Sequence, residues 1–132
     1  MNITIKEALE ALNERGYAVS SVEDVAVVFD KDLEDFPVYV SSDDEGREIV
    51  CSVKLFTEDD LIESKRSEAM EAMLSSNKLI PLSAFNKQDE IYELYGQLTG
   101  GSVDALVVEI ETILENVPDS MDMMKSYFKG VE

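Results

Sequence analysis

Residues 79–98, LIPLSAFNKQDEIYELYGQL, contain two apolar runs separated by a polar turn. Pro81 blocks the continuation of a preceding helix, because its ring removes a backbone donor and clashes with the previous turn. The residues after it predict two strands, over 82–87 and 91–98, joined by Asn86–Glu90. We expect this hairpin to extend a sheet and to seat the helix that follows it.

The segment after the hairpin carries the clearest helical periodicity in the chain. TGGS at 99–102 ends the second strand, and the Ser102 side chain can cap a helix that starts beside it. Pro118 either kinks this helix or begins a new turn, and the apolar stripe continues beyond it. The apolar positions are Val103, Leu106, Val107, Ile110, Ile113, Leu114 and Val117, followed by Met121, Met124 and Phe128.

The N-terminal segment predicts a first amphipathic helix over residues 5–15. Thr4 and Glu7 have the spacing of a capping box, in which each side chain satisfies a free backbone donor of the first turn. Gly16 offers a C-terminal cap, because glycine adopts the left-handed conformation that ends many helices.

Between this helix and the hairpin, three β-branched and aromatic runs predict strands, at 25–30, 36–40 and 49–56. A second helix is expected to begin at Thr57, with an apolar stripe on one side. The resulting order is α-β-β-β-α-β-β-α. An antiparallel sheet packed on helices buries these stripes, so we predict an α+β fold and a single domain over residues 1–132.

The chain is strongly acidic, with 29 acidic and 11 basic residues and a formal net charge of -18. A hydrophobic content of 45% predicts a folded body rather than a disordered acidic tail. The negative surface disfavours direct binding to nucleic acids and to anionic membranes. It favours a basic partner, such as a basic peptide or a protein that normally binds DNA.

Cellular location is inferred from cysteine usage and from the absence of targeting patterns. Cys51 has no second cysteine with which to form an intramolecular disulfide, which fits a reducing compartment. The first 17 residues hold no continuous apolar run of signal-peptide length, and no stretch approaches a membrane span. We therefore expect a cytoplasmic protein.

The residue types that usually carry catalysis are scarce. Without histidine, the chain lacks the commonest general base and metal ligand. Cys51 alternates with apolar residues and is expected in the core. The loop DKDLED resembles a calcium-binding loop but has Asp35 where glycine is required and Ser41 where a glutamate is required. We read this loop and the acidic turn at 43–45 as solvated charge, and predict no catalytic residue, metal or cofactor.

Apolar surfaces are therefore the better candidates for function. Methionine adapts to several partners because its side chain is flexible and polarizable, although the same residues could simply fill the core. Tyr92 and Tyr95 fall on opposite faces of their strand, so one should face the core and the other solvent. The candidate partner-binding residues are Met70, Met73, Leu74, Phe85, Tyr92, Tyr95, Met121 and Met124.

The runs LIPLSAF and IYELYGQL, followed by a long acidic helix, resemble the YjfI-like family of small acidic bacterial proteins. That resemblance implies a bacterial cytoplasmic protein, sometimes encoded beside a homologue of the membrane-associated phage shock protein A. It assigns no catalytic residue. The order of elements is also similar to that of type III secretion chaperones and of the YbjN-like proteins that share their fold. The secretion chaperones are typically small acidic dimers that hold an extended segment of a client.

Three functional hypotheses follow. The leading one is a non-enzymatic protein-binding module, a chaperone or adaptor that meets its client through the hairpin or a helix stripe and that could also form a homodimer. The second is an acidic nucleic-acid mimic that inhibits a DNA-binding protein. The third is a carboxylate-dependent enzyme, which requires at least two acids converging in a pocket with shifted pKa values.

Overall fold

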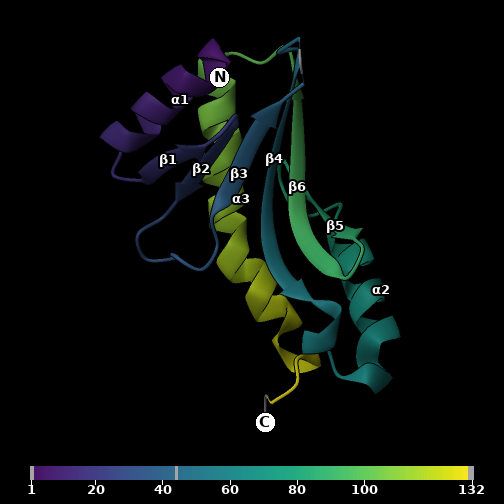
Figure 1. The fold of residues 1–132 in the computed structure, drawn as a ribbon. Helices are drawn as coiled ribbons and strands as arrows, with labels where there is room; N and C mark the ends of the chain where they lie inside the picture. Colours follow the sequence, from purple (N-terminus) through teal and green to yellow (C-terminus); the bar gives the residue numbers. More distant parts are fainter. Residues whose placement is uncertain (1, 44, 131–132) are drawn as a thin grey trace.

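The computed structural model describes residues 2–43 and 45–130, where a six-stranded antiparallel sheet packs against three α-helices (Figure 1). The strands follow the order β1-β2-β3-β4-β6-β5 across the sheet. Asp44, in the acidic turn of the sequence analysis, lies outside the described residues. The elements are α1 (Ile3–Glu14), β1 (Ala18–Val22), β2 (Val25–Phe29), β3 (Val38–Ser42), β4 (Glu48–Thr57), α2 (Arg66–Ser76), β5 (Ala84–Gln88), β6 (Ile91–Thr99) and α3 (Val103–Met124).

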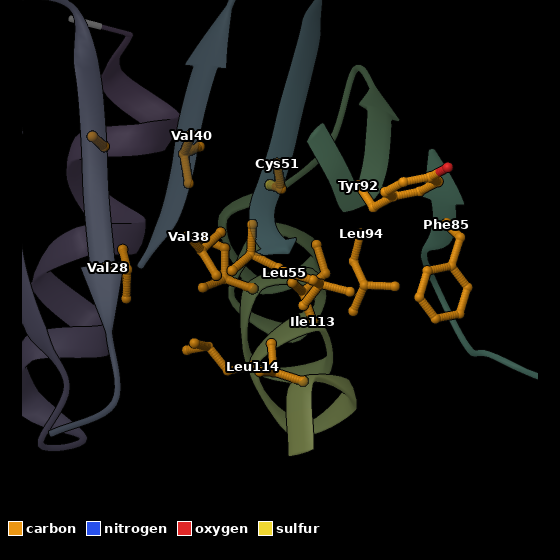
Figure 2. Close-up of a cluster of buried hydrophobic side chains, with 14 of the residues drawn as sticks. Val28, Val38, Val40, Cys51, Leu55, Phe85, Tyr92, Leu94, Ile113 and Leu114 are labelled. Carbon is orange, nitrogen blue, oxygen red and sulfur yellow. The ribbon is translucent and has the colours of Figure 1, made fainter. Parts of the chain in front are cut away.

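The sheet buries one face against the helices. Along β4, alternate side chains such as Cys51 and Val53 point into a single cluster of buried apolar residues, as sheet pleating requires (Figure 2). A register shift between Lys54 and Phe56 places both Leu55 and Phe56 in the core, because a bulge lets two consecutive side chains face the same side. Cys51 is fully buried, and its burial raises the pKa of its thiol to about 12.

Helix α3 runs along the buried face and confirms the helix predicted after the hairpin (Figure 1). The Ser102 hydroxyl caps it by accepting a hydrogen bond from the Ala105 amide at 3.1 Å. The helix continues through Pro118 to Met124. No helix within residues 2–43 and 45–130 combines the length and apolarity that crossing a bilayer requires.

The predicted fold class is confirmed, but the structure contains one strand more than the predicted order. Strand β1 pairs with β2 through a two-residue turn at Glu23 and Asp24, and Glu23 adopts a positive φ of 56°. Such turns usually contain asparagine or glycine, so the sequence lacks the common hairpin signal at this point. The two serines of β1, Ser20 and Ser21, also lower its strand propensity.

Two predicted helix starts were wrong. Helix α1 is capped by Asn2, whose Oδ1 accepts hydrogen bonds from the amides of Thr4 and Ile5, and Thr4 lies inside the helix. Asn2 also donates to the Gly46 carbonyl, which ties the helix start to the β3–β4 turn. A cap two residues earlier therefore satisfies the first turn better than the Thr4 box.

The second helix starts at Arg66 rather than Thr57. Thr57 and Asp60 do form a capping box, but it closes only one 3-10 turn over Glu58–Asp60. Leu61 then leaves the helical path, because it is fully buried and forms an isolated β-bridge with Phe128 near the C-terminus.

The β5–β6 hairpin occurs where the sequence predicted it. Its turn is shorter than expected, at Asp89 and Glu90, and β5 begins two residues later than predicted. Tyr92 is buried on the helix-covered face, whereas Tyr95 is partly exposed on the opposite face beside Ser52 of β4. The expected division between the two tyrosines is therefore present.

Candidate functional site

Five of the eight candidate partner-binding residues converge on one groove between α2 and the β5–β6 hairpin. The cavity has a volume of about 90 Å³ and a largely apolar lining. We call it the α2–β5 groove, and its lining residues are Met70, Met73, Leu74, Phe85, Asn86, Lys87 and Tyr92.

Helix α2 forms one wall of the α2–β5 groove. Its side chains at 69 and 73 are buried against the sheet, which fixes the orientation of the helix. Met70 and Leu74, one helical turn apart on the same side, remain 41% and 69% exposed. The wall therefore presents two apolar side chains to whatever enters the groove.

Phe85 and Tyr92 form the floor of the groove, at the edge of the buried cluster (Figure 2). The Tyr92 ring stacks on Phe56 with 5.1 Å between ring centroids, and Phe56 makes an edge contact with Phe128. The Tyr92 hydroxyl is buried but has no hydrogen-bond partner among the described residues. A buried hydroxyl of this kind is normally paired, and the charged group beside it is the Lys87 ammonium, whose pKa the Tyr92 side chain helps to raise.

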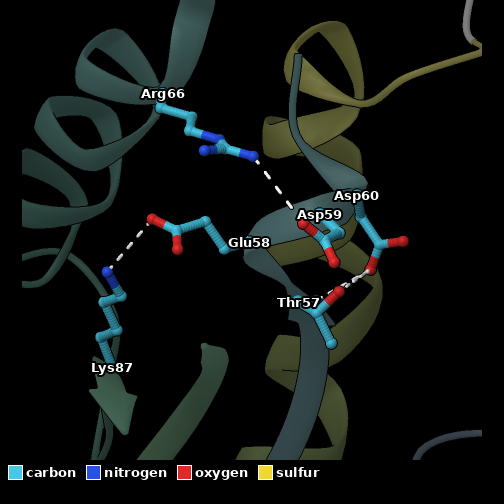
Figure 3. A network of polar contacts seen from close by, with 6 residues as sticks. All are labelled: Thr57, Glu58, Asp59, Asp60, Arg66 and Lys87. Carbon is cyan, nitrogen blue, oxygen red and sulfur yellow. Dashed lines mark hydrogen bonds and ion pairs between the residues drawn. The ribbon is translucent and has the colours of Figure 1, made fainter. Parts of the chain in front are cut away.

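A polar network borders the groove at the end of β4 (Figure 3). Glu58 accepts a hydrogen bond from Lys87 Nζ at 3.3 Å, and this contact is the largest cause of the raised pKa of Lys87. The same ammonium lies 5.6 Å from the centroid of the Tyr92 ring. Asp59 pairs with Arg66 at 3.9 Å, which joins the β4 end to the start of α2.

The outer edge of β5 is partly closed by Asn77, at the end of α2. Asn77 Oδ1 accepts a hydrogen bond from the Phe85 amide at 2.6 Å, and its Nδ2 donates to the Phe85 carbonyl at 3.4 Å. The side chain thus occupies the positions that a neighbouring strand would use. The apolar groove remains accessible beside an edge that is blocked at this residue.

The other three candidates lie elsewhere. Tyr95 is on the opposite face of the sheet. Met121 lines a separate cavity of about 300 Å³ with Phe128 and Asp59, among other residues. Met124 is fully buried. The structure therefore brings the three α2 candidates together with Phe85 and Tyr92 of the hairpin, and leaves Tyr95 and the two α3 methionines apart from them.

One carboxyl that the sequence analysis missed is buried on α3. Glu109 is 2% exposed, its Oε1 has no hydrogen-bond partner among the described residues, and burial raises its pKa to about 7. It fits against Gly96, where any Cβ would collide with this oxygen. Within residues 2–43 and 45–130, no three His, Cys, Asp or Glu side chains form a group suited to a metal ion. The sequence signal that could have revealed this buried carboxyl is the position of a glutamate within the apolar stripe of α3.

The family model described as "uncharacterized protein conserved in bacteria (DUF2170)" matches residues 3–128. The chain belongs to this family. The matched range includes the whole α2–β5 groove. No curated protein matches the chain. The narrower resemblance to YjfI-like proteins stays a prediction.

Several solved structures share the fold. The chain is similar to a chain of the ExsC–ExsE complex, with a TM-score of 0.65 and 14% identity over 98% of this chain and 99% of that one. It is similar to the complex of the type III secretion chaperone SycH from Yersinia pestis with a stable YscM2 fragment, with a TM-score of 0.55 and 18% identity over 86% and 96%. For YbjN from E. coli the values are 0.60 and 11% over 92% and 89%. These similarities confirm the predicted type III secretion chaperone-like architecture.

Proposed function

We propose that this protein is a non-enzymatic protein-binding module, a cytoplasmic chaperone or adaptor that holds a bacterial protein partner in the α2–β5 groove. The observation that carries the proposal is the meeting of exposed Met70 and Leu74 with the floor formed by Phe85 and Tyr92. Exposed apolar side chains grouped over an apolar floor are typical of protein-interaction sites.

The similar folds support the same class of function. ExsC was solved in complex with ExsE, and SycH in complex with a fragment of YscM2. Each of these complexes joins a protein of this architecture to another protein. A homologue of phage shock protein A, which the family resemblance implies, is a specific partner to test first.

The net charge of -18 has a secondary role in the proposal. It keeps the molecule soluble and attracts basic partners over a distance of about one Debye length, roughly 8 Å at physiological salt. The apolar contact in the groove then provides affinity that salt does not screen. A partner held in this way stays bound at moderate salt, whereas a purely electrostatic contact dissociates.

Capture experiments with matched variants test the proposal. Immobilised wild type should retain a discrete bacterial protein through a moderate-salt wash, and the double variant Met70→Ser, Leu74→Ser should lose it. Ile3→Ser is the control, because Ile3 is 65% exposed on α1, away from the groove. Equal capture by the wild type and the double variant would show that the groove is not the binding site.

A further inference from the structure

We infer that the partner segment in the α2–β5 groove is a basic amphipathic α-helix whose last turn lies over Tyr92 and Lys87. This inference rests on the proposed function and specifies the class of partner. Four features of the groove carry it: the blocked strand edge, the spacing of the exposed apolar side chains, the unpaired hydroxyl and the surrounding charge.

The blocked edge disfavours a partner that adds a β-strand. Strand addition at β5 requires the outward amide and carbonyl of Phe85, and Asn77 already binds both groups. An incoming strand would have to displace this side chain and forfeit two hydrogen bonds. A helix has no such requirement, because its own backbone satisfies its hydrogen bonds.

The spacing of apolar residues on α2 suits a second helix. Met70 and Leu74 lie at positions i and i+4, which form a ridge along the exposed side of α2. Phe85 lies across the groove from this ridge and forms part of its floor. A partner helix with apolar residues at the same spacing can place one side chain between the ridge and Phe85.

The Tyr92 hydroxyl calls for a hydrogen-bond acceptor on the partner. The residue is only 3% exposed and lines the groove, and its hydroxyl has no partner at hydrogen-bond distance among the described residues, although the Lys87 ammonium lies beside it. The last turn of a helix carries up to four carbonyl groups without intrahelical partners. The ammonium of Lys87, close to Tyr92, complements the negative end of a helix dipole.

The surroundings of the groove favour basic residues beside the apolar stripe of the partner. Glu58 and Glu90 are adjacent, because the Glu58 amide donates to the Glu90 carbonyl at 2.8 Å. Lys87, which lines the groove, is paired with Glu58 at 3.3 Å. Lysine or arginine residues flanking the partner stripe would therefore meet carboxylates.

Two designed peptides of identical composition test the inference by fluorescence anisotropy. In the first, leucine and lysine follow helical spacing, and in the second the same residues alternate as in a strand. The helical peptide should bind the wild type at least about tenfold more tightly. The inference is overturned if the strand peptide binds equally well.

Three variants locate the binding. Leu74→Asp should weaken the helical peptide by more than about tenfold, although the added charge would strengthen a purely electrostatic contact with lysine. Ile3→Asp adds the same charge away from the groove and should not weaken it. Tyr92→Phe should weaken binding about fivefold, the usual value of one hydrogen bond. Unchanged affinity in Leu74→Asp or Tyr92→Phe would refute the assigned position of the helix.

Asn77→Ala tests why strands are excluded. Removing the side chain frees the Phe85 amide and carbonyl, so the strand peptide should gain affinity relative to the wild type. No gain would show that Asn77 does not set the preference. The proposed function fails separately: a captured partner that ignores the Met70 and Leu74 variants refutes it, whereas a groove-dependent partner that binds as a strand refutes only the present inference.

Discussion

Helices α3 and α2 pack on the same face of one sheet, but they bury very different shares of their residues. Helix α3 buries nine of its 22 residues, whereas α2 buries only Ala69 and Met73 of its 11. Helix α2 leaves Met70 and Leu74 exposed side by side over one groove, whereas α3 exposes Val108. The difference separates a helix that stabilises the fold from one that presents a surface.

Substitutions that remove matched apolar volume should show this difference most strongly. Ile110→Ala on α3 should lower the free energy of unfolding by about 4 kcal/mol, because Ile110 is fully buried and the change leaves a cavity. Met70→Ala on α2 should cost less than about 1 kcal/mol, because the side chain already contacts water. Urea denaturation of both variants provides the measurement. Comparable losses would mean that α2 is as important to the core as α3.

The difference between α3 and α2 also explains which elements of the fold could be predicted from the sequence. The α3 stripe and the hairpin after Pro81 are strong local patterns, since their periodicity reports directly on one buried face. The start of α2 was mispredicted because Leu61 is held by Phe128, a residue 67 positions away. Local capping rules at Thr57 carry no information about such a distant contact.

The candidate site was predictable only in part. Met70, Leu74 and Phe85 were recognisable as apolar residues outside the strongest stripes. Their meeting in one groove depends on the hairpin folding back beside α2, which sequence spacing does not encode. The hydrogen bond between Asn77 and Phe85 could not be predicted for the same reason, because it requires the end of α2 to lie at hydrogen-bond distance from the edge of β5.

A second prediction concerns the Glu109 carboxyl, which is buried on α3. The pKa of Glu109 is raised from 4.5 to about 7, so the folded state keeps a proton that the unfolded state releases. Its stabilising effect is fully present below about pH 4.5 and is lost as the pH rises to about 7, a change of up to about 3 kcal/mol.

The variant Glu109→Gln isolates this effect. It cannot ionise, so its unfolding free energy should fall less than that of the wild type between pH 5 and 8. Above pH 7 the variant should be the more stable protein. Burial and the nearby Glu109 raise the pKa of the Cys51 thiol to about 12, so Cys51 stays protonated throughout this range. Its titration therefore does not contribute to the difference between the two proteins. Parallel pH profiles for the two proteins would show that Glu109 is ionised at no cost in the folded state.

The smallest expected effect lies where α2 ends, at Asn77. Asn77→Ala should lower the free energy of unfolding by about 1 kcal/mol, because it removes two hydrogen bonds to Phe85 but leaves those backbone groups free to bind water. Asn77→Asp keeps an acceptor for the Phe85 amide but sets a carboxylate oxygen against the Phe85 carbonyl, so it should not restore the stability of the wild type. An Asn77→Ala variant as stable as the wild type would contradict a stabilising role for the 2.6 Å bond. The Ala variant should also self-associate at high concentration in sedimentation experiments, because an unblocked β5 edge can pair with another chain.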